Sequence, residues 1–243
     1  MMNIINKLSA KQKDLQGAHP ITIAFLGDSV TQGCFECYQT GVNSLETVFD
    51  VKCAYSTHVR EILAILYPNV QVNIINSGIS GDSTLGGVAR IERDILCYNP
   101  DLVIVSYGLN DSTAGEGALE DYAKRLEEIF RKIQAIGAEC IFLTENMMNT
   151  DISVHFCNDK FFSNVSKGFA DVQNSGTLDK YFDKAKEFAE KCGVKVCDCY
   201  AKWKAMYAGG VNITEMLANK INHPIRELTY IFAYSLIECM FMQ

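Results

Sequence analysis

A serine that could act as a nucleophile stands at the end of an apolar run. Ser29 completes the tripeptide Gly27-Asp28-Ser29 directly after residues 21–27, where a buried strand would turn into a helix. A serine at such a turn can expose its hydroxyl, and its own backbone N–H can point at the same region. The alternative is an N-cap serine, which is common at these turns. The tripeptide alone does not decide, because Gly81-Asp82-Ser83 repeats it after a loop, where Ser83 is expected to cap a helix.

Acyl transfer to a serine also needs hydrogen-bond donors for the oxyanion of the tetrahedral intermediate. Gly81 can supply a backbone N–H from a loop where no side chain obstructs approach, and Asn110 can supply a side-chain N–H. Each of them alone could be an ordinary turn residue. Together with Ser29, however, they follow three successive apolar runs, and turn chemistry alone explains that pattern poorly.

The general base is expected among four histidines. His19 lies in the N-terminal linker, His58 falls inside a helical stripe, and His155 lies in a long connection. His223 precedes Pro224, which is predicted to be the first residue of a C-terminal helix. A loop entering that helix can reach the carboxyl edge of a sheet, so His223 is the predicted base and His155 the second choice.

Five short apolar runs must position these residues. They lack clean alternation, which is typical of strands buried on both faces, and they are Ile21–Gly27, Val70–Asn76, Asp101–Tyr107, Ala138–Thr144 and Gly193–Asp198. Stretches of helical period lie between them, which predicts an α/β fold with a five-stranded parallel sheet in a single domain, residues 1–243. Two long connections, from Ser29 to Cys53 and from Glu145 to Ser175, are expected to be loops beside the site. The second holds four phenylalanines that could form an apolar wall, Phe156, Phe161, Phe162 and Phe169.

The composition excludes several partners. With 22 basic and 29 acidic residues the net charge is -7, which argues against binding to nucleic acid. No run reaches the roughly 18 apolar residues that a membrane span needs. Residues 1–14 are expected to form an amphipathic helix and not a signal peptide, so a cytoplasmic protein with ten reduced cysteines is predicted. The apolar segment Ile231–Met242 could dock on the sheet or form a homodimer face, and docking is the expected role.

No metal or cofactor is expected. Cys34 and Cys37 have the spacing of half a zinc site, but no second pair has comparable spacing. No glycine-rich phosphate loop is present either. Cys34 lies only five residues after Ser29, so it is expected to line the site.

These segments together resemble the SGNH hydrolases, the GDSL family of lipases and acylhydrolases. The first family block is matched by Gly27-Asp28-Ser29, the second by the segment ending at Gly81, the third by residues 108–111 and the last by His223-Pro224. The resemblance implies a flavodoxin-like three-layer α/β/α sandwich with Ser29 as the nucleophile. It also implies an oxyanion hole formed by the N–H groups of Ser29 and Gly81 and the side chain of Asn110.

The sequence departs from the family pattern beside the histidine. The family usually has an aspartate three residues before it, where this chain has Lys220, and the nearby Asn219 and Asn222 carry no charge. In serine proteases, neutralising the orienting aspartate lowers turnover by about 10⁴. Three arrangements remain open: a backbone carbonyl that orients His223 in a Ser–His dyad, which we favour, a distant carboxylate such as Asp198, or a slow or altered function.

The function that this pattern favours is hydrolysis of a small-molecule carboxylic ester through an acyl-enzyme on Ser29. The acyl group is expected to be short or medium in length, and an acetylated carbohydrate is one candidate substrate. The absent aspartate motivates a second hypothesis, a non-catalytic acyl- or carbohydrate-binding module on a hydrolase scaffold.

Overall fold

A five-stranded parallel sheet forms the centre of the protein. The computed structural model describes residues 1–42 and 44–242, and in that part of the chain the strand order is β4-β1-β5-β6-β7. The strands are β1 (Ile21–Gly27), β4 (Val72–Gly78), β5 (Leu102–Ser106), β6 (Glu139–Leu143) and β7 (Lys195–Cys197). Each lies within two residues of its predicted bounds. The order is that of flavodoxin-like sheets, so the predicted fold class is confirmed.

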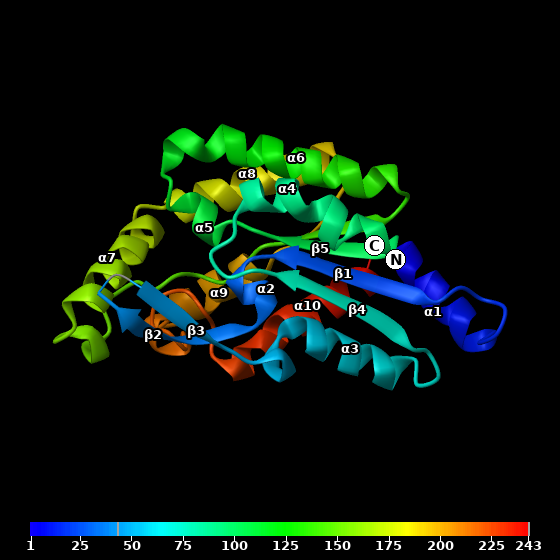
Figure 1. The fold of residues 1–243 in the computed structure, drawn as a ribbon, viewed down its shortest axis with the longest axis horizontal. Helices are drawn as coiled ribbons and strands as arrows, with labels where there is room; N and C mark the ends of the chain where they lie inside the picture. Colours follow the sequence, from blue (N-terminus) through cyan, green and yellow to red (C-terminus); the bar gives the residue numbers. More distant parts are fainter. Residues whose placement is uncertain (43, 243) are drawn as a thin grey trace.

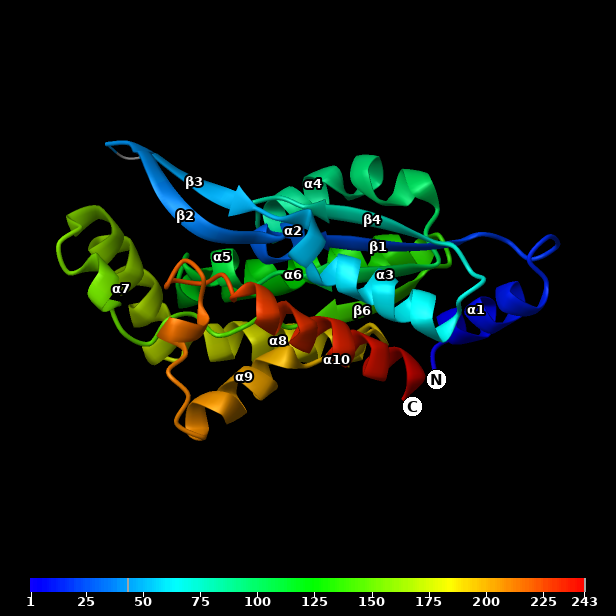
Figure 2. The same ribbon diagram turned by 90° about the horizontal axis from the view of Figure 1, so that it is seen from below.

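Helices cover both faces of this sheet, as Figures 1 and 2 show. One face carries α4 (Thr84–Asp94), α6 (Leu119–Ala135) and α8 (Thr177–Lys191), and the other carries α1 (Asn3–Lys13), α3 (Tyr55–Leu66) and α10 (Thr229–Phe241). A further helix, α9 (Cys199–Ala208), follows β7. In α6 the apolar residues that recur at helical spacing are buried, for example Leu126, Ile129 and Phe130. Burial of both sheet faces explains why the strands read as continuous apolar runs.

The two long connections are not the loops that were expected. The first contains an antiparallel hairpin of β2 (Cys34–Gly41) and β3 (Ser44–Phe49), and the second contains α7 (Lys160–Asn174). Most of the hairpin is exposed, so it lacks the apolar pattern that marks a buried strand. The buried face of α7 is partly polar, with Ser166 and Gln173 on it, which obscures the helical period.

The C-terminal helix also begins later than predicted. Pro224 does not start it but pairs with Leu217 in an isolated β-bridge, and α10 begins at Thr229 after a short 3-10 turn, Arg226–Leu228. His223 therefore lies in a closed loop before that turn. The helix itself packs on the sheet layer and buries Phe232 among other apolar side chains.

Glycines let a short helix sit directly on the ends of two strands. Gly27 and Gly78 are register partners at the carboxyl ends of β1 and β4. A Cβ atom on Gly27 would lie 2.1 Å from Thr31 Oγ1, and one on Gly78 would lie 2.1 Å from the backbone nitrogen of Gln32. Only glycine fits at either position, and this close approach places α2 (Ser29–Gln32) at the sheet edge.

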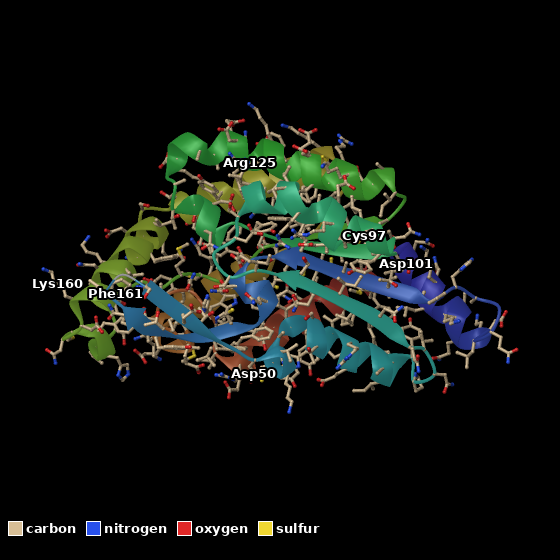
Figure 3. The ribbon with its side chains drawn as sticks, in the orientation of Figure 1. Asp50, Cys97, Asp101, Arg125, Lys160 and Phe161 are labelled. Atoms are coloured by element: carbon tan, nitrogen blue, oxygen red, sulfur yellow. The ribbon has the colours of Figure 1, made fainter. Side chains whose placement is uncertain are left out.

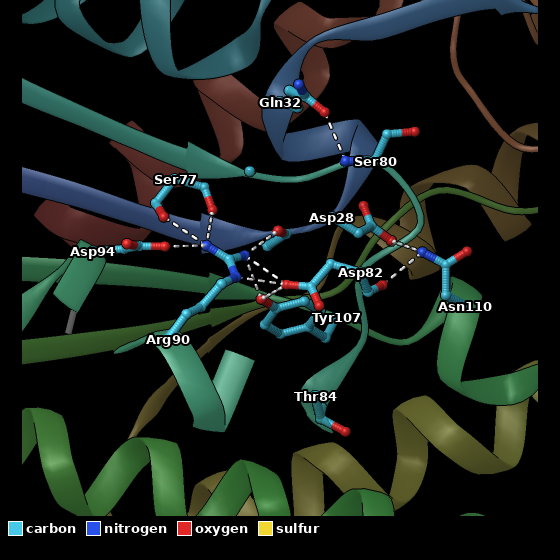
Figure 4. A network of polar contacts seen from close by, with 12 residues as sticks. Asp28, Gln32, Ser77, Ser80, Asp82, Thr84, Arg90, Asp94, Tyr107 and Asn110 are labelled. Atoms are coloured by element: carbon cyan, nitrogen blue, oxygen red, sulfur yellow. Dashed lines mark hydrogen bonds and ion pairs between the residues drawn. The ribbon is translucent and has the colours of Figure 1, made fainter. Parts of the chain in front are cut away.

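The guanidinium of Arg90 forms hydrogen bonds at the carboxyl ends of three neighbouring strands (Figure 4). Its guanidinium donates to Gly27 O at 2.9 Å, to Ser77 O at 2.7 Å and to Tyr107 Oη at 2.8 Å. It also forms an ion pair with Asp82 at 2.7 Å, and both side chains are nearly buried. A single cation thereby links β1, β4 and the residue after β5.

Replacing Arg90 should destabilise the fold. Arg90→Met is expected to lower the free energy of unfolding by about 3–5 kcal/mol, because Asp82 would remain buried without its partner. Urea denaturation measures this quantity. The matched control is Arg93→Met, whose side chain is 76% exposed in its ion pair with Asp94 and should contribute less than about 1 kcal/mol. Equal losses for the two variants would contradict the role given to Arg90.

Candidate active site

Ser29 and His223 meet at the carboxyl edge of the sheet. The Oγ of Ser29 lies 2.9 Å from Nε2 of His223, although 194 residues separate them in the sequence. Ser29 is the first residue of α2, whose N-cap Asp28 accepts a hydrogen bond from Val30 N at 2.9 Å. Both Ser29 and His223 are 3% exposed. His155, the second choice for the base, is exposed in the 3-10 turn of residues 154–156 and is not part of this pair.

A backbone carbonyl faces the other nitrogen of the imidazole. Nδ1 of His223 lies 2.9 Å from the carbonyl oxygen of Phe35 on β2. Because a carbonyl oxygen can only accept, the hydrogen bond requires the proton on Nδ1 and leaves the lone pair of Nε2 facing the Ser29 hydroxyl. This is the geometry of the Ser–His dyad with an orienting carbonyl, the first of the three arrangements considered for this chain.

The residues near the usual aspartate position have other partners. Lys220 adopts a left-handed conformation with φ of 57°, and its Nζ pairs with Glu215 at 2.9 Å. The Oδ1 atom of Asn219 accepts hydrogen bonds from three successive backbone N–H groups, residues 221–223, at 2.9 to 3.0 Å. Asn219 therefore shapes the loop that presents His223, a role that its lack of charge concealed in the sequence.

Asp198 does not orient His223. One carboxylate oxygen accepts from Thr144 Oγ1 at 2.9 Å and from Ala201 N at 3.0 Å, and the other pairs with Lys186 at 3.3 Å. Asp198 is the N-cap of α9, the structural role that competed with the catalytic one.

Burial sets the protonation state of the histidine. It lowers the pKa of His223 to about 4, while the hydrogen bond to Phe35 and the charge of Glu36 act in the opposite direction. The imidazole is therefore neutral at about pH 7, which is the form that can accept a proton from a serine hydroxyl.

Gly81 and Asn110 face the same region. Gly81 has φ of 78°, and an added Cβ would meet nothing within 4 Å, so its backbone borders open space. Among residues 1–42 and 44–242 its N–H has no hydrogen-bond acceptor. The Nδ2 of Asn110 donates to Asp28 Oδ2 at 3.1 Å and to Asp82 O at 2.7 Å, as Figure 4 shows. Both amide protons are thus engaged, and a ligand would have to share the longer contact, the one to Asp28.

A buried pair of carboxyl groups lies behind Asn110. Asp28 and Glu145 are both buried, and among the described residues Oε1 of Glu145 has no hydrogen-bond partner. Burial raises the pKa of each carboxyl, and the charge of Asp28 raises the pKa of Glu145 further. The raised pKa values favour a protonated carboxyl in this pair, and Glu145 Oε2 accepts a hydrogen bond from Leu109 N at 3.0 Å. Sequence reasoning missed Glu145, although its position directly after a strand run was a usable signal.

A cavity of about 140 Å³ lies at the site, and Ser29, Gly81, Asn110 and His223 are among its lining residues. The hairpin and α7 both project at this edge of the sheet (Figure 2), and both contribute to the lining. The full lining set is Ser29, Cys37, Leu45, Thr47, Ser80, Gly81, Asn110, Val165, Phe169, Asn219, Ile221, Asn222 and His223. All four predicted site residues are therefore brought together in one small cavity.

Two expectations about its lining need correction. Cys37 lines the cavity and Cys34 does not; Cys34 is buried at the start of β2, where its Sγ accepts a hydrogen bond from Thr47 Oγ1 at 3.4 Å. Burial raises the pKa of Cys37 to about 11, so this thiol stays protonated. Phe169 is the one member of the expected apolar wall that reaches the cavity. Phe161 lies at the outer end of α7 (Figure 3), where its ring packs edge-on against Phe162, and Phe162 in turn stacks on Phe156.

The described residues hold neither a metal-binding cluster nor a membrane-spanning helix. They contain no group of three His, Cys, Asp or Glu side chains that could hold a metal ion together. None of their helices combines the length and apolar character that crossing a bilayer requires. All ten cysteines are free thiols in this part of the chain.

Known proteins share both sequence and fold with this chain. An acetylxylan esterase from Geobacillus stearothermophilus is 32% identical over 89 residues, 37% of this chain and 39% of that protein. An arylesterase from Vibrio mimicus is 40% identical over 52 residues, 21% of this chain and 26% of that protein. The matched segments thus span less than half the length of either relative.

Solved structures of low sequence identity have the same fold. A catalytic mutant of Axe2, an acetylxylan esterase from Geobacillus stearothermophilus, has a TM-score of 0.66 at 19% identity, covering 92% of this chain and 95% of that one. A two-domain esterase (CEX) active on acetylated mannans has a TM-score of 0.66 at 20% identity, covering 100% of this chain and 54% of that one. The model of the GDSL-like lipase/acylhydrolase family matches residues 25–227. That match covers most of the sequence, and the chain belongs to the GDSL-like lipase/acylhydrolase family.

Proposed function

We propose that this protein is a serine esterase that removes a short acyl group, acetyl above all, from a carbohydrate hydroxyl. The observation that carries the proposal is the 2.9 Å contact between Ser29 Oγ and Nε2 of a neutral, buried His223, located in a small cavity. The family assignment and the relatives that are esterases of acetylated xylan and mannan support it. The whole of residues 1–243 is proposed to act as one hydrolase domain.

In the first half-reaction Ser29 Oγ attacks the carbonyl carbon of the ester while its proton passes to His223 Nε2. The negative oxygen that forms accepts hydrogen bonds from the backbone N–H groups of Gly81 and Ser29. It also accepts one from the side-chain N–H of Asn110 that otherwise donates to Asp28. The bond from carbon to the leaving oxygen then breaks. That oxygen takes the proton from His223, and the alcohol departs.

The second half-reaction repeats these transfers with water. Nε2 of His223 accepts a proton from water while the water oxygen attacks the acyl carbon. The bond between that carbon and Ser29 Oγ then breaks, and the proton passes from Nε2 to Oγ. The carboxylic acid is released and the free enzyme is restored. Throughout, the Phe35 carbonyl accepts from Nδ1–H and stabilises the imidazolium that forms in each step.

The cavity limits the acyl group. Its volume of about 140 Å³ is smaller than the roughly 300–1,000 Å³ of sites that enclose drug-sized ligands. A long acyl chain does not fit such a space, whereas an acetyl group does, with the alcohol part of the ester outside. The non-catalytic alternative rested on the absent aspartate, and the Phe35 carbonyl now supplies an acceptor in its place.

The nucleophile is tested by substitution. Ser29→Ala and His223→Ala are each expected to lose at least about 10³-fold in kcat, because the two groups act as a unit. The measurement is hydrolysis of p-nitrophenyl acetate and acetate release from acetylated xylo-oligosaccharides. An organophosphonate should add its mass to Ser29 in the wild type. The matched control is Ser83→Ala in the second Gly-Asp-Ser tripeptide, which should keep full activity; the assignment is wrong if Ser29→Ala does so.

The pH dependence follows from the lowered pKa of His223. The base must be neutral, so kcat/KM should stay constant as the pH falls through 6.5 and be half lost only near the pKa of about 4. Initial rates on p-nitrophenyl acetate give the profile. Circular dichroism at each pH separates loss of the base from acid unfolding. A midpoint at the ordinary histidine value, about 6.5, would contradict the account.

The cavity size predicts selectivity for acyl length. The kcat/KM for p-nitrophenyl octanoate should be at least about tenfold lower than that for the acetate, because the longer chain must displace Phe169 or remain outside. Phe169→Ala should reduce this preference by enlarging the cavity. Phe161→Ala, in the same helix but outside the cavity lining, serves as the control. An unchanged preference in Phe169→Ala would refute the limit set by the cavity.

A further inference from the structure

The Phe35 carbonyl that faces His223 belongs to a bulge in the hairpin. Cys34 pairs with Phe49 and Cys37 pairs with Thr47, so two residues of β2 oppose a single residue of β3. Bulges of this kind bend a strand and redirect its groups, and they are frequent beside active sites. The bulge takes Phe35 out of the regular ladder, and its oxygen points at Nδ1 of His223 instead. A bulge alone, however, does not keep a carbonyl at a fixed distance from a side chain on another loop.

One arginine contacts both residues of that bulge. The guanidinium of Arg226 donates to the two carboxylate oxygens of Glu36 at 2.5 and 2.9 Å, a two-pronged ion pair. Its Cζ also lies 4.3 Å from the centre of the Phe35 ring, in stacking range for a cation and an aromatic face. Planar guanidinium groups suit both contacts, which a lysine would not reproduce.

The same arginine is attached to the histidine loop. Arg226 lies three residues after His223, so one short segment carries the imidazole and the cation. Its Nε also contacts Asp50 at 3.3 Å, directly after β3, at the lower edge of the molecule in Figure 3. Arg226 thus ties the base of the hairpin to the loop that holds His223, across the hydrogen bond between Phe35 and His223.

We propose that Arg226, through Glu36, is the positioning residue that holds the Phe35 carbonyl against His223 and so fills the place of the absent aspartate. The inference rests on the proposed esterase function. Arg226 and Glu36 are about one third and just under half exposed, so their pair contributes little to the stability of the fold. Its removal should therefore alter catalysis in a protein that remains folded.

The charges around His223 provide a readout that a purely structural role would not affect. The titratable neighbours are Glu36 and Cys37 of β2, with Asp50 and Arg226 beyond Glu36. Cys37 stays neutral because burial raises its pKa. Both the hydrogen bond to Phe35 and the charge of Glu36 raise the pKa of His223, and the hydrogen bond is the larger of the two. Glu36→Gln removes both contributions, so it disfavours the imidazolium.

The test is a pair of substitutions that each remove one charge of the ion pair, with steady-state kinetics on p-nitrophenyl acetate. Arg226→Gln and Glu36→Gln should each lower kcat about 10- to 100-fold, with KM nearly unchanged, because the base loses its orientation. The double variant should be no worse than either single one, and Arg226→Lys should recover only part of the loss. The control is Arg131→Gln, which breaks an exposed ion pair with Glu127 on α6 and should change nothing.

The pH profiles give the second half of the test. The acidic limb of kcat/KM should move to lower pH in Glu36→Gln, because that variant loses both the charge of Glu36 and the hydrogen bond to Phe35, and it should stay in place in Arg131→Gln. A wild-type kcat in Arg226→Gln, or an acidic limb that does not move in Glu36→Gln, would overturn the proposal.

A readout without turnover separates this proposal from the esterase function. In proton NMR, the Nδ1–H of His223 should exchange with water faster in Arg226→Gln than in the wild type or in Arg131→Gln. Equal exchange would overturn the positioning role even in a fully active enzyme. An inactive wild type that an organophosphonate does not label would refute the esterase function, and the exchange comparison would still decide the role of Arg226.

Discussion

The hydrogen bond from His223 Nδ1–H to the carbonyl oxygen of Phe35 is the interaction on which the site depends. It fixes the tautomer of a buried imidazole and thereby turns the lone pair of Nε2 toward Ser29. A carboxylate in this place would add a full charge, and a carbonyl adds only a dipole. The pKa of His223 is accordingly low, about 4, because burial outweighs the groups that favour the charged form.

The rest of the carboxyl edge is built so that polar groups can approach each other closely. Glycine at positions 27 and 78 allows α2 to pack directly against two strand ends. The guanidinium of Arg90 donates hydrogen bonds to the carbonyl oxygens of Gly27 and Ser77 at the same ends. Asp28 then serves α2 as its N-cap and accepts a hydrogen bond from Asn110, while burial raises the pKa of the neighbouring Glu145 carboxyl and favours its neutral form. The groups proposed as oxyanion donors are thus held in place before any substrate binds, and such preorganised donors stabilise a transition state most effectively.

Much of this arrangement could be predicted from the sequence, and the missing parts have physical reasons. Strands such as β5 are buried on both faces, so their apolar runs were plain, and Ser29 and Asn110 stood out as polar residues at strand ends. The Phe35 carbonyl could not be predicted, because a backbone oxygen has no residue type and its direction depends on a bulge. The hairpin that carries it is mostly exposed and has no apolar pattern to reveal it.

The tautomer of His223 tests the central claim most directly. Nitrogen-15 NMR of protein labelled at histidine distinguishes a ring nitrogen that bears a proton from one that does not. The account predicts a neutral ring at about pH 7 with the proton on Nδ1, bonded to Phe35, and an unprotonated Nε2 facing Ser29. A proton on Nε2 with a bare Nδ1, or an imidazolium at that pH, would contradict it.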